Sequence, residues 1–274
     1  VFQANFENKA KNIKLISKKL SLNLDSFVFF DDNPAERQIV EQMLPEVTVI
    51  NVPDDPAYFS KTIRCSGYFD TLQFTKEDKK RVKFYAADAK RSDLKLKLGD
   101  YNHYLKSLKM SIIHHKFKEQ NLERIVQLIN KTNQFNLRTK RYSEIDIKKI
   151  LKNKKVYTLQ SKLIDKFGDN GIISLIIANE DNKNLFIDTW LMSCRVLKRD
   201  VEKSVINEIV KFARKRKIKT LIGEYIESPK NKLVKNHYLD LNFKLYKKNK
   251  SKKSAVYHLD IKQFQILKTQ IKVN

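Results

Sequence analysis

The first part of the chain alternates between helical and extended hydrophobic patterns. Residues 6–20 carry apolar side chains at helical spacing with lysines on the other faces, which predicts a helix. The apolar run 26–30 ends in two aspartates and a proline, as is typical of a buried strand followed by a turn. A helix at 34–43 and an alternating strand at 46–52 complete one β-α-β step of a parallel sheet. One step cannot bury both faces of its sheet, so we expect further strands to precede Val1.

A long charged segment then separates this step from the rest of the chain. Residues 75–106 are predicted to form a helix, with Thr75 as its N-cap and Asp78 at the capping-box position. We interpret this helix as a connector and expect a boundary near residue 108. The predicted organisation is therefore a first domain at 1–74, a helical connector at 75–108 and a second domain at 109–274.

The second domain shows neither repeats nor low-complexity linkers, and its pattern predicts a mixed α/β unit. The expected order is β-α-α-β-β-β-α-β-α-β-β. The predicted strands are 111–117, 155–164, 171–179, 184–193, 218–226, 243–248 and 255–260, and the predicted helices are 120–136, 143–153, 200–217 and 229–241.

Composition limits the class of protein. The 274 residues are 41% hydrophobic, which is enough to bury the cores of two domains. No apolar run approaches the roughly 20 residues that span a bilayer, and no signal segment opens the chain. Two cysteines, Cys65 and Cys194, are too few for a disulfide framework. These features predict a cytoplasmic protein with no membrane association.

The formal net charge of +25 raises the question of a nucleic-acid partner. The lysines are spread over nearly every segment instead of forming one stripe, which argues against nucleic acid as the main partner. A basic surface still attracts anionic partners, such as phosphorylated metabolites or acidic carrier proteins.

Four sequence runs carry a resemblance to a known family. They are FFDDNPAER at 29–37, INKTNQFN at 129–136 followed by Arg141-Tyr142, DKFGDNG at 165–171, and IDTWLMSCRVL at 187–197. Their order and spacing resemble FkbH-type proteins, which pair a haloacid-dehalogenase-like (HAD-like) phosphatase domain with a GNAT-like acyltransferase domain. The resemblance implies an α/β fold: a partial HAD-like Rossmannoid parallel sheet, its C-terminal part only, followed by a GNAT-like mixed α/β sheet.

The resemblance also implies a reaction. In such proteins a glyceryl unit is taken from 1,3-bisphosphoglycerate, a phosphorylated three-carbon metabolite, and held as a thioester on a cysteine. The unit then passes to the phosphopantetheine thiol of an acyl carrier protein, and the product enters polyketide-type biosynthesis. An acyl carrier protein is thus the expected macromolecular partner.

Cys194 is the expected nucleophile, because thioesters exchange readily between thiols. Arg195, Arg199 and the helix expected from Asp200 are predicted to lower its pKa. The alternative is a small core residue at a strand end. Cys65 has no comparable setting and is expected to be structural.

Asp31 and Asp32 stand where a parallel strand is predicted to end, which is the ligand-binding edge of open α/β sheets. The HAD resemblance makes one of them a Mg²⁺ ligand, whereas helix capping is the alternative. Lys9 resembles the lysine that balances phosphoryl charge in HAD enzymes. The HAD nucleophile motif, D-x-D-x-Thr/Ser, is absent. Phosphatase activity is therefore expected only in a full-length protein that contains it.

The GNAT-like part departs from its pattern at the pyrophosphate loop, Arg/Gln-x-x-Gly-x-Gly/Ala. The matching run begins at Arg195, and Lys198 and Asp200 fill both glycine positions. This argues against acetyl-CoA binding, although Lys198 and Arg199 could hold the single phosphate of phosphopantetheine.

Other candidate residues come from the same runs. Tyr238 resembles the tyrosine that protonates a departing thiolate in GNAT enzymes, and an amphipathic-helix role is the alternative. His237, His114 and His115 are candidate bases by their chemistry alone. Polar side chains that could orient the substrate, or simply form caps and turns, are Asn130, Asn133, Gln134, Arg141, Asp169, Asn170 and Asp188.

Two other functions compete with cysteine-dependent acyl transfer. One is a GNAT-type, acetyl-CoA-dependent N-acetyltransferase with no covalent step. The other is a basic, non-catalytic module that binds nucleic acid or a carrier protein.

Overall fold

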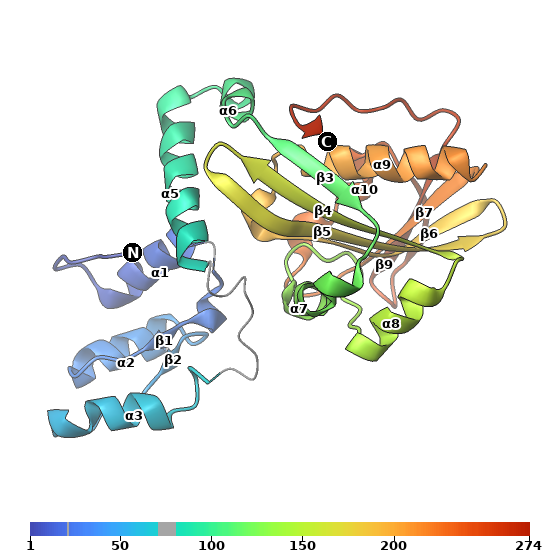
Figure 1. Ribbon diagram of the computed structural model, residues 1–274. Coiled ribbons are helices and arrows are strands. Elements are labelled where there is room, and N and C mark those ends of the chain that lie inside the picture. Colours follow the sequence, from blue (N-terminus) through green and yellow to red (C-terminus); the bar gives the residue numbers. More distant parts are fainter. Residues whose placement is uncertain (21, 71–80) are drawn as a thin grey trace. The chain divides into compact units, whose positions relative to one another are not determined.

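The computed structural model describes residues 1–20, 22–70 and 81–274 of the chain (Figure 1). They belong to two compact units, Val1–Tyr85 and Ala86–Asn274. The division falls within helix α5 (Arg81–Leu98). The three-part organisation drawn from the sequence stays a prediction, and the helix cap predicted at Thr75 and Asp78 lies outside the described residues.

The first unit contains the predicted β-α-β step in a shortened form. Strands β1 (Val28–Phe29) and β2 (Thr48–Val49) pair in parallel, with helix α2 (Pro34–Met43) between them. The Asn33 side chain caps α2 by accepting a hydrogen bond from the Ala35 amide at 2.9 Å. Helix α1 (Lys9–Leu20) packs against α2 over a small apolar core, which consists of Ala10, Ile13, Val40, Leu44 and Val47.

Helix α3 (Phe59–Cys65) was not predicted from the sequence, and its last residue, Cys65, is exposed rather than part of a core. The short 3₁₀ turns of this unit are η1 (Leu24–Ser26) and η2 (Pro56–Tyr58). The HAD-like character of the unit stays a prediction, because two-residue strands define only a minimal sheet.

The second unit is a mixed α/β structure built on one large sheet. In the described residues the sheet has eight strands in the order β10-β3-β4-β5-β6-β7-β9-β8. Neighbours are antiparallel except for β10 with β3 and β6 with β7. The strands are β3 (Ser111–His115), β4 (Val156–Asp165), β5 (Gly168–Asp181), β6 (Asn184–Met192), β7 (Thr220–Ile226), β8 (Lys244–Asn249), β9 (Ser254–Asp260) and β10 (Lys272–Val273).

Helices cover both faces of this sheet (Figure 1). Helix α9 (Val201–Lys215) lies on one face and α7 (Leu122–Lys131) and α8 (Glu144–Lys152) on the other. The remaining helices are α5, α6 (Tyr101–Ser107) and α10 (His237–Asp240), and the 3₁₀ turns are η3 (Glu119–Asn121), η4 (Cys194–Val196) and η5 (Lys232–Val234). From β3 to β9 the elements follow the predicted order β-α-α-β-β-β-α-β-α-β-β.

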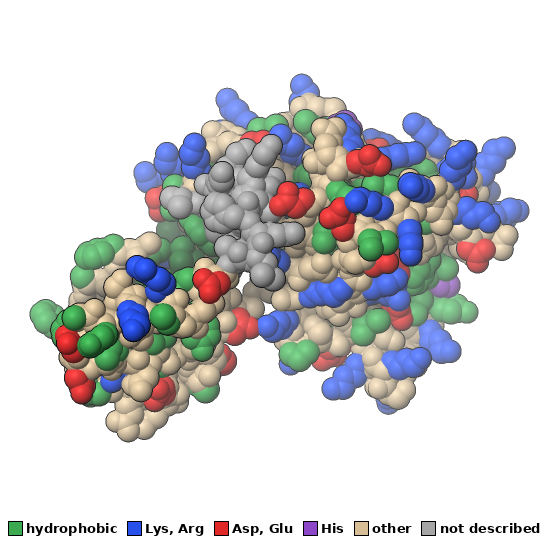
Figure 2. All heavy atoms as spheres, turned by 60° about the horizontal axis from the view of Figure 1, so that its bottom comes forward, with side chains coloured by type: hydrophobic (Ala, Val, Ile, Leu, Met, Phe, Trp, Pro, Cys, Tyr) green, Lys and Arg blue, Asp and Glu red, His purple; other side chains and the backbone are tan. Residues whose placement is uncertain are grey.

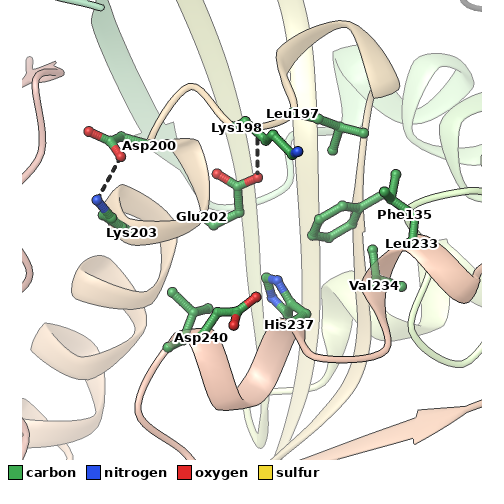
Figure 3. Close-up of a pocket in the computed structure, with 11 residues that line it drawn as sticks. Phe135, Leu197, Lys198, Asp200, Glu202, Lys203, Leu233, Val234, His237 and Asp240 are labelled. Carbon is green, nitrogen blue, oxygen red and sulfur yellow. Dashed lines mark hydrogen bonds and ion pairs between the residues drawn. The ribbon is translucent and has the colours of Figure 1, made fainter. Parts of the chain in front are cut away.

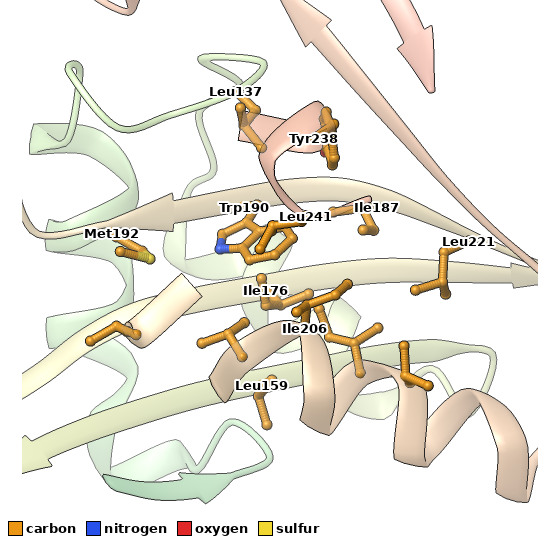
Figure 4. Packing of buried hydrophobic residues seen from close by; sticks show 14 of the residues in the cluster. Leu137, Leu159, Ile176, Ile187, Trp190, Met192, Ile206, Leu221, Tyr238 and Leu241 are labelled. Atoms are coloured by element: carbon orange, nitrogen blue, oxygen red, sulfur yellow. The ribbon is translucent and has the colours of Figure 1, made fainter. Parts of the chain in front are cut away.

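The larger core lies between α9 and the sheet (Figure 4). Trp190 and Met192 of β6 point into it, whereas Leu191 between them belongs to the core under α7 and α8. Ile206 of α9 packs in the same layer as Trp190. Strand β6 is therefore buried on both faces, which explains its nearly continuous apolar sequence.

Three predicted helices end differently in the structure. The helix predicted at 75–106 breaks at Gly99, whose φ of +64° ends α5, and Asp100 caps α6 by accepting from the His103 amide at 2.6 Å. The helix predicted at 120–136 ends at Lys131. Within the predicted 229–241 helix only η5 and the four-residue α10 form.

The last of these differences has a clear cause in the buried Asn231. Its side-chain amide donates to the carbonyls of Asn136 and Ile226, each at 2.9 Å, and its oxygen accepts from the Ser228 amide. These side-chain bonds replace the helical ones, which sequence periodicity does not reveal.

Among the described residues, no helix combines the length and the apolar character that crossing a bilayer would require.

The packing of β3 against α9 predicts a pH-dependent stability. The ring nitrogens of His114 lie 2.9 and 3.0 Å from the hydroxyls of Ser161 and Ser204, and burial lowers the pKa of His114 to about 4. The unfolded chain binds a proton near the ordinary pKa of 6.5, so stability falls as pH drops from 6.5 toward 4.

We expect His114 to account for a loss of about 1 kcal/mol between about pH 7 and pH 5.5. Urea unfolding of the wild type and of His114→Gln at both pH values measures it. The variant should show the smaller pH dependence. Equal pH dependence in both proteins would contradict a neutral, buried His114.

Candidate functional site

Cys194 lies just beyond the end of β6, in an irregular segment that is held by main-chain bonds. The Ser193 amide donates to the Ile173 carbonyl at 2.8 Å, and the Met192 amide donates to Phe135 at 3.1 Å. Cys194 then opens the 3₁₀ turn η4, and its side chain is exposed. The alternative of a small core cysteine therefore does not apply.

The electrostatics of this thiol differ from the expectation. Desolvation by the surrounding protein raises the pKa of Cys194, and the charge of Arg195 only partly opposes this effect. The predicted lowering was wrong for a structural reason: the guanidinium of Arg199 is directed to other carboxylates, and α9 begins only at Val201. The resting cysteine is a thiol at neutral pH.

A buried ion network anchors the segment on its other side. The Arg91 guanidinium donates to both carboxylate oxygens of Asp165, at 2.9 and 2.8 Å, and to Asp88 at 2.8 Å. Arg199 lies 3.6 Å from Asp88 and from Asp165, and the Asn170 amide donates to Asp165 at 3.2 Å. This network ties α5, the β4–β5 turn and the loop after Cys194 together.

The network includes two of the predicted substrate-binding residues, and two others lie beside it. Arg199 is 8% exposed and Asn170 1% exposed, so both are structural partners of Asp165. Asp169 is exposed and pairs with Lys162 at 2.7 Å. Arg195 extends back to the same turn, where it donates to the Ser193 hydroxyl at 3.3 Å and to the Asn170 carbonyl at 3.5 Å.

Strands β6 and β7 separate beyond their first four residue pairs. Their parallel pairing covers Asn184–Ile187 and Thr220–Gly223. Residues 135–137 fill the gap that follows: the Leu137 amide donates to the Trp190 carbonyl at 3.3 Å, and the Ile226 amide donates to the Leu137 carbonyl at 2.9 Å. The free edge of β6 is thus covered by the chain itself.

Asp188, another predicted substrate residue, forms the centre of a second polar cluster. It stands at a bulge where β6 shifts register against β5, and it accepts from Arg138 at 2.7 Å, from Lys140 at 3.1 Å and from the Tyr142 hydroxyl. Burial raises its pKa, but the Tyr142 hydrogen bond and the charges of Lys140 and Arg138 outweigh this, and the net shift is downward.

The polar side chains of the 129–136 run support the loop that carries these cations. The Asn130 amide donates to the Tyr142 carbonyl at 3.0 Å, and Asn133 accepts from Arg141. Gln134, beside them, is half-buried. The geometry gives Asn130 and Asn133 the loop-forming role that was the alternative for them in the sequence.

A cavity of about 270 Å³ opens between the start of α9 and α10 (Figure 3). Apolar side chains line much of it, together with Lys198, Lys203, Asp200, Glu202, Asp240 and His237. His237 is 6% exposed, its Nε2 has no hydrogen-bond partner within the part of the chain that the structure describes, and burial lowers its pKa to about 3. The imidazole is therefore neutral, and it contacts the aromatic rings of Phe135 and Trp190.

Tyr238 lies deeper than a proton donor to a thiolate would be expected to lie. It is 1% exposed, and burial raises its pKa far above the ordinary value. Gly223 of β7 leaves room for its ring, since a Cβ at that position would lie 2.3 Å from two ring carbons. Its other ring contacts are with Trp190, Phe243 and Tyr257.

The first unit brings two predicted residues together. The Lys9 ammonium lies 3.5 Å from the Asp31 carboxylate, which also accepts from the Asn33 amide. Asp32 is exposed, and Arg37 donates to the carbonyls of Asp31 and Asp32. Across the described part of the chain, no three His, Cys, Asp or Glu side chains gather as a metal-ligand set. The pair places a carboxylate beside a positive charge at the end of β1.

The predicted residues thus separate into distinct places. Cys194, Arg195, Arg199, Asp169 and Asn170 lie around the β4–β5 turn, whereas His237 and Tyr238 belong to α10 and Asp188 lies at the β6 bulge. Sequence reasoning missed Glu202, Phe135 and Trp190. Glu202 could have been found from the sequence, because its carboxylate stands two positions after the start of the predicted helix, where acidic side chains are favoured.

The surface charge is distributed as the sequence suggested. Figure 2 shows lysine and arginine side chains scattered over the visible face, with acidic side chains between them.

Comparisons with known proteins give structural similarities alone. No family model and no curated protein matches the chain. The solved structures that it resembles include the ribosomal-protein-S18-alanine N-acetyltransferase of Escherichia coli, at 12% identity over 55% of this chain and 94% of that one, with a TM-score of 0.43. The PaiA N-acetyltransferase of Thermoplasma acidophilum, in complex with coenzyme A, matches at 14% identity over 55% and 99%, with a TM-score of 0.44.

A third similarity covers a different share of the chain. The N-terminal part of a Bacteroides fragilis protein, which contains a phosphatase domain and is complexed with Mg, matches at 44% identity. The match covers 27% of this chain and 20% of that one, with a TM-score of 0.26. The class that the structure itself defines is a mixed α/β protein with one large mixed sheet.

The ion network predicts a strong stability effect at Asp165. Asp165→Asn leaves Arg91 and Arg199 without their buried counter-charge, so we expect a loss of about 3 kcal/mol in the free energy of unfolding. Asp169→Asn, in the same turn, removes an exposed ion pair and should cost less than about 1 kcal/mol. Urea denaturation of both variants measures the difference. Similar losses would show that the network does not hold the loop.

The raised pKa predicts slow alkylation of Cys194 at neutral pH. In a Cys65→Ala variant, where Cys194 alone reports, the iodoacetamide rate should rise with a midpoint above that of a free cysteine peptide measured alongside, because less thiolate is present at each pH. Arg195→Ala should move the midpoint further up. A midpoint below that of the peptide would contradict the desolvated thiol.

Proposed function

We propose that this chain is an acyltransferase of the FkbH type, which carries an acyl unit as a thioester on Cys194. The acyl donor is an acyl phosphate such as 1,3-bisphosphoglycerate, and the acceptor is the phosphopantetheine thiol of an acyl carrier protein. The observation that carries the proposal is an exposed thiol at the end of a central strand, in a loop anchored by a buried ion network.

The proposed reaction has two balanced steps. In the first, the Cys194 sulfur bonds to the acyl carbon, the carbon–oxygen bond to phosphate breaks, and the leaving phosphate takes up the thiol proton. In the second, the pantetheine sulfur bonds to the same carbon, the bond to Cys194 breaks, and the proton of the incoming thiol returns to the Cys194 sulfur. A resting thiol with a raised pKa suits this scheme, because each step provides its own proton acceptor.

The proposed role of the anchored loop is to position the sulfur. Nucleophilic attack requires the reacting atoms to be held close together in a defined orientation. The bidentate Arg91–Asp165 pair and the Arg199 contacts restrict the segment that follows Cys194. These residues act through the loop and are positioning residues.

For the first unit we propose a part in handling the phosphoryl group. Asp31, with Asp32 beside it, would contribute carboxylate oxygen to a Mg²⁺ ion, and Lys9 would balance phosphoryl charge. When bound, Mg²⁺ supplies charge neutralisation for phosphate oxygens. The 3.5 Å Lys9–Asp31 pair supports this proposal.

A second candidate, an acetyl-CoA-dependent N-acetyltransferase, is favoured by one observation. Lys198 and Asp200 have φ values of 60° and 62°, the left-handed conformation that glycine ordinarily provides in a phosphate loop. A third, a basic non-catalytic module, rests on the net charge alone.

The experiment runs the second step of the proposed reaction in reverse, because that step involves no phosphate. Glyceryl-S-pantetheine should acylate the chain by the reverse of the second step, and intact-protein mass spectrometry should show one added glyceryl group. The adduct should be lost in Cys194→Ala and retained in Cys65→Ala. Acylation that persists in Cys194→Ala, or that is missing from both variants, would overturn the covalent mechanism. N-acetylation from acetyl-CoA by Cys194→Ala would favour the second candidate.

A further inference from the structure

The loop before α9 keeps the shape of a phosphate-binding loop although its glycines are absent. Lys198 and Asp200 both adopt positive φ, which costs free energy for residues with a Cβ. Asp200 is the N-cap of the 15-residue α9 but makes no side-chain cap hydrogen bond. The first amides of α9 therefore lack the side-chain acceptor that an N-cap ordinarily provides, and an anion is the acceptor that a helix start favours.

A carboxylate of the chain itself takes this place. Glu202 accepts a hydrogen bond from the Lys198 amide at 3.3 Å (Figure 3). Burial raises the pKa of Glu202, and the hydrogen bonds from its own amide and from that of Lys198 oppose this effect only in part. The Asp200 carboxylate instead pairs with Lys203 at 2.8 Å and accepts from the Gln270 amide at 3.4 Å. The Lys198 amide, which a phosphate oxygen could otherwise approach, is thus bonded to Glu202.

The charge of the adjoining cavity adds to this effect. Two lysines, Lys198 and Lys203, face three carboxylates among the residues that line it, Asp200, Glu202 and Asp240. His237 contributes no positive charge, since its buried imidazole is neutral, and its unpartnered Nε2 offers a single hydrogen bond. The rest of the lining is apolar: Phe135, Leu197, Leu233, Val234 and Leu241. Such a cavity suits an uncharged, partly apolar arm with amide groups.

The edge of β6 also limits where a pantetheine arm can bind. An extended ligand often binds by adding main-chain hydrogen bonds to a free strand edge. Here residues 135–137 already bond to the Trp190 carbonyl and the Met192 amide. An incoming arm must therefore lie in the cavity between α9 and α10 and be recognised there.

We propose that Glu202 is a specificity-determining residue, an internal carboxyl group that excludes the diphosphate of coenzyme A from the start of α9 and leaves the cavity to the uncharged pantetheine arm. This deepens the proposed function, on which it rests, by defining which thiol carriers the site accepts. A carrier protein presents pantetheine without a nucleotide diphosphate, so the exclusion separates it from free coenzyme A.

The experiment measures binding and no chemistry. In a Cys194→Ala background, calorimetry gives the Kd of pantetheine and of coenzyme A for the unaltered site and for Glu202→Gln. We expect pantetheine to bind about tenfold more tightly than coenzyme A at the unaltered site. Glu202→Gln should tighten coenzyme A about tenfold and leave pantetheine within about twofold.

A matched control separates the local effect from the net charge. Glu208→Gln removes one negative charge from the same helix, at a surface ion pair with Lys211. It should leave both Kd values unchanged. The proposal would be overturned if Glu208→Gln lowered the Kd of coenzyme A as much as Glu202→Gln does, or if Glu202→Gln left that Kd unchanged. It would also be overturned if neither ligand bound to the unaltered site or to Glu202→Gln. Because every protein in this experiment lacks Cys194, the binding result does not depend on whether the chain transfers an acyl group.

Discussion

The bidentate contact between Arg91 and Asp165 is the constraint on which the arrangement of the larger unit depends. It is buried at both ends, and it joins a helix to a strand end 74 residues away in the sequence. Charges removed from water are stable only when they are fully paired, so the network brings Arg199 and Asn170 with it. The loop that carries Cys194 thereby acquires a defined path, while the thiol itself stays exposed.

The separation of β6 and β7 creates the second organising feature. Two parallel strands that diverge leave main-chain groups without partners, and buried groups of this kind must be satisfied. The chain satisfies them with residues 135–137 and with the Asn231 side chain. The same solution places Phe135 at the wall of the cavity and covers the edge where an extended ligand would bind.

Desolvation, more than nearby charge, sets the protonation states of the site. It keeps His237 neutral, raises the pKa of Cys194 despite Arg195, and raises the pKa of Glu202 although backbone amides stabilise its charge. A site of this character favours uncharged ligands and reactions that carry their own proton acceptors. Transfer of an acyl unit from Cys194 to a neutral pantetheine thiol, as proposed, has both properties.

The sequence alone determined the order of helices and strands from β3 to β9, because alternation and helical spacing of apolar residues are local properties. It also singled out Cys194, the loop at Lys198 and Asp200, and the Lys9 and Asp31 pair. Only the tertiary structure decided what surrounds them. Whether Arg199 faces a phosphate or Asp165, and whether Glu202 faces solvent or the start of its own helix, depends on contacts between distant segments. Burial, which sets the pKa of each group, arises from those contacts and leaves no trace in the spacing of residues.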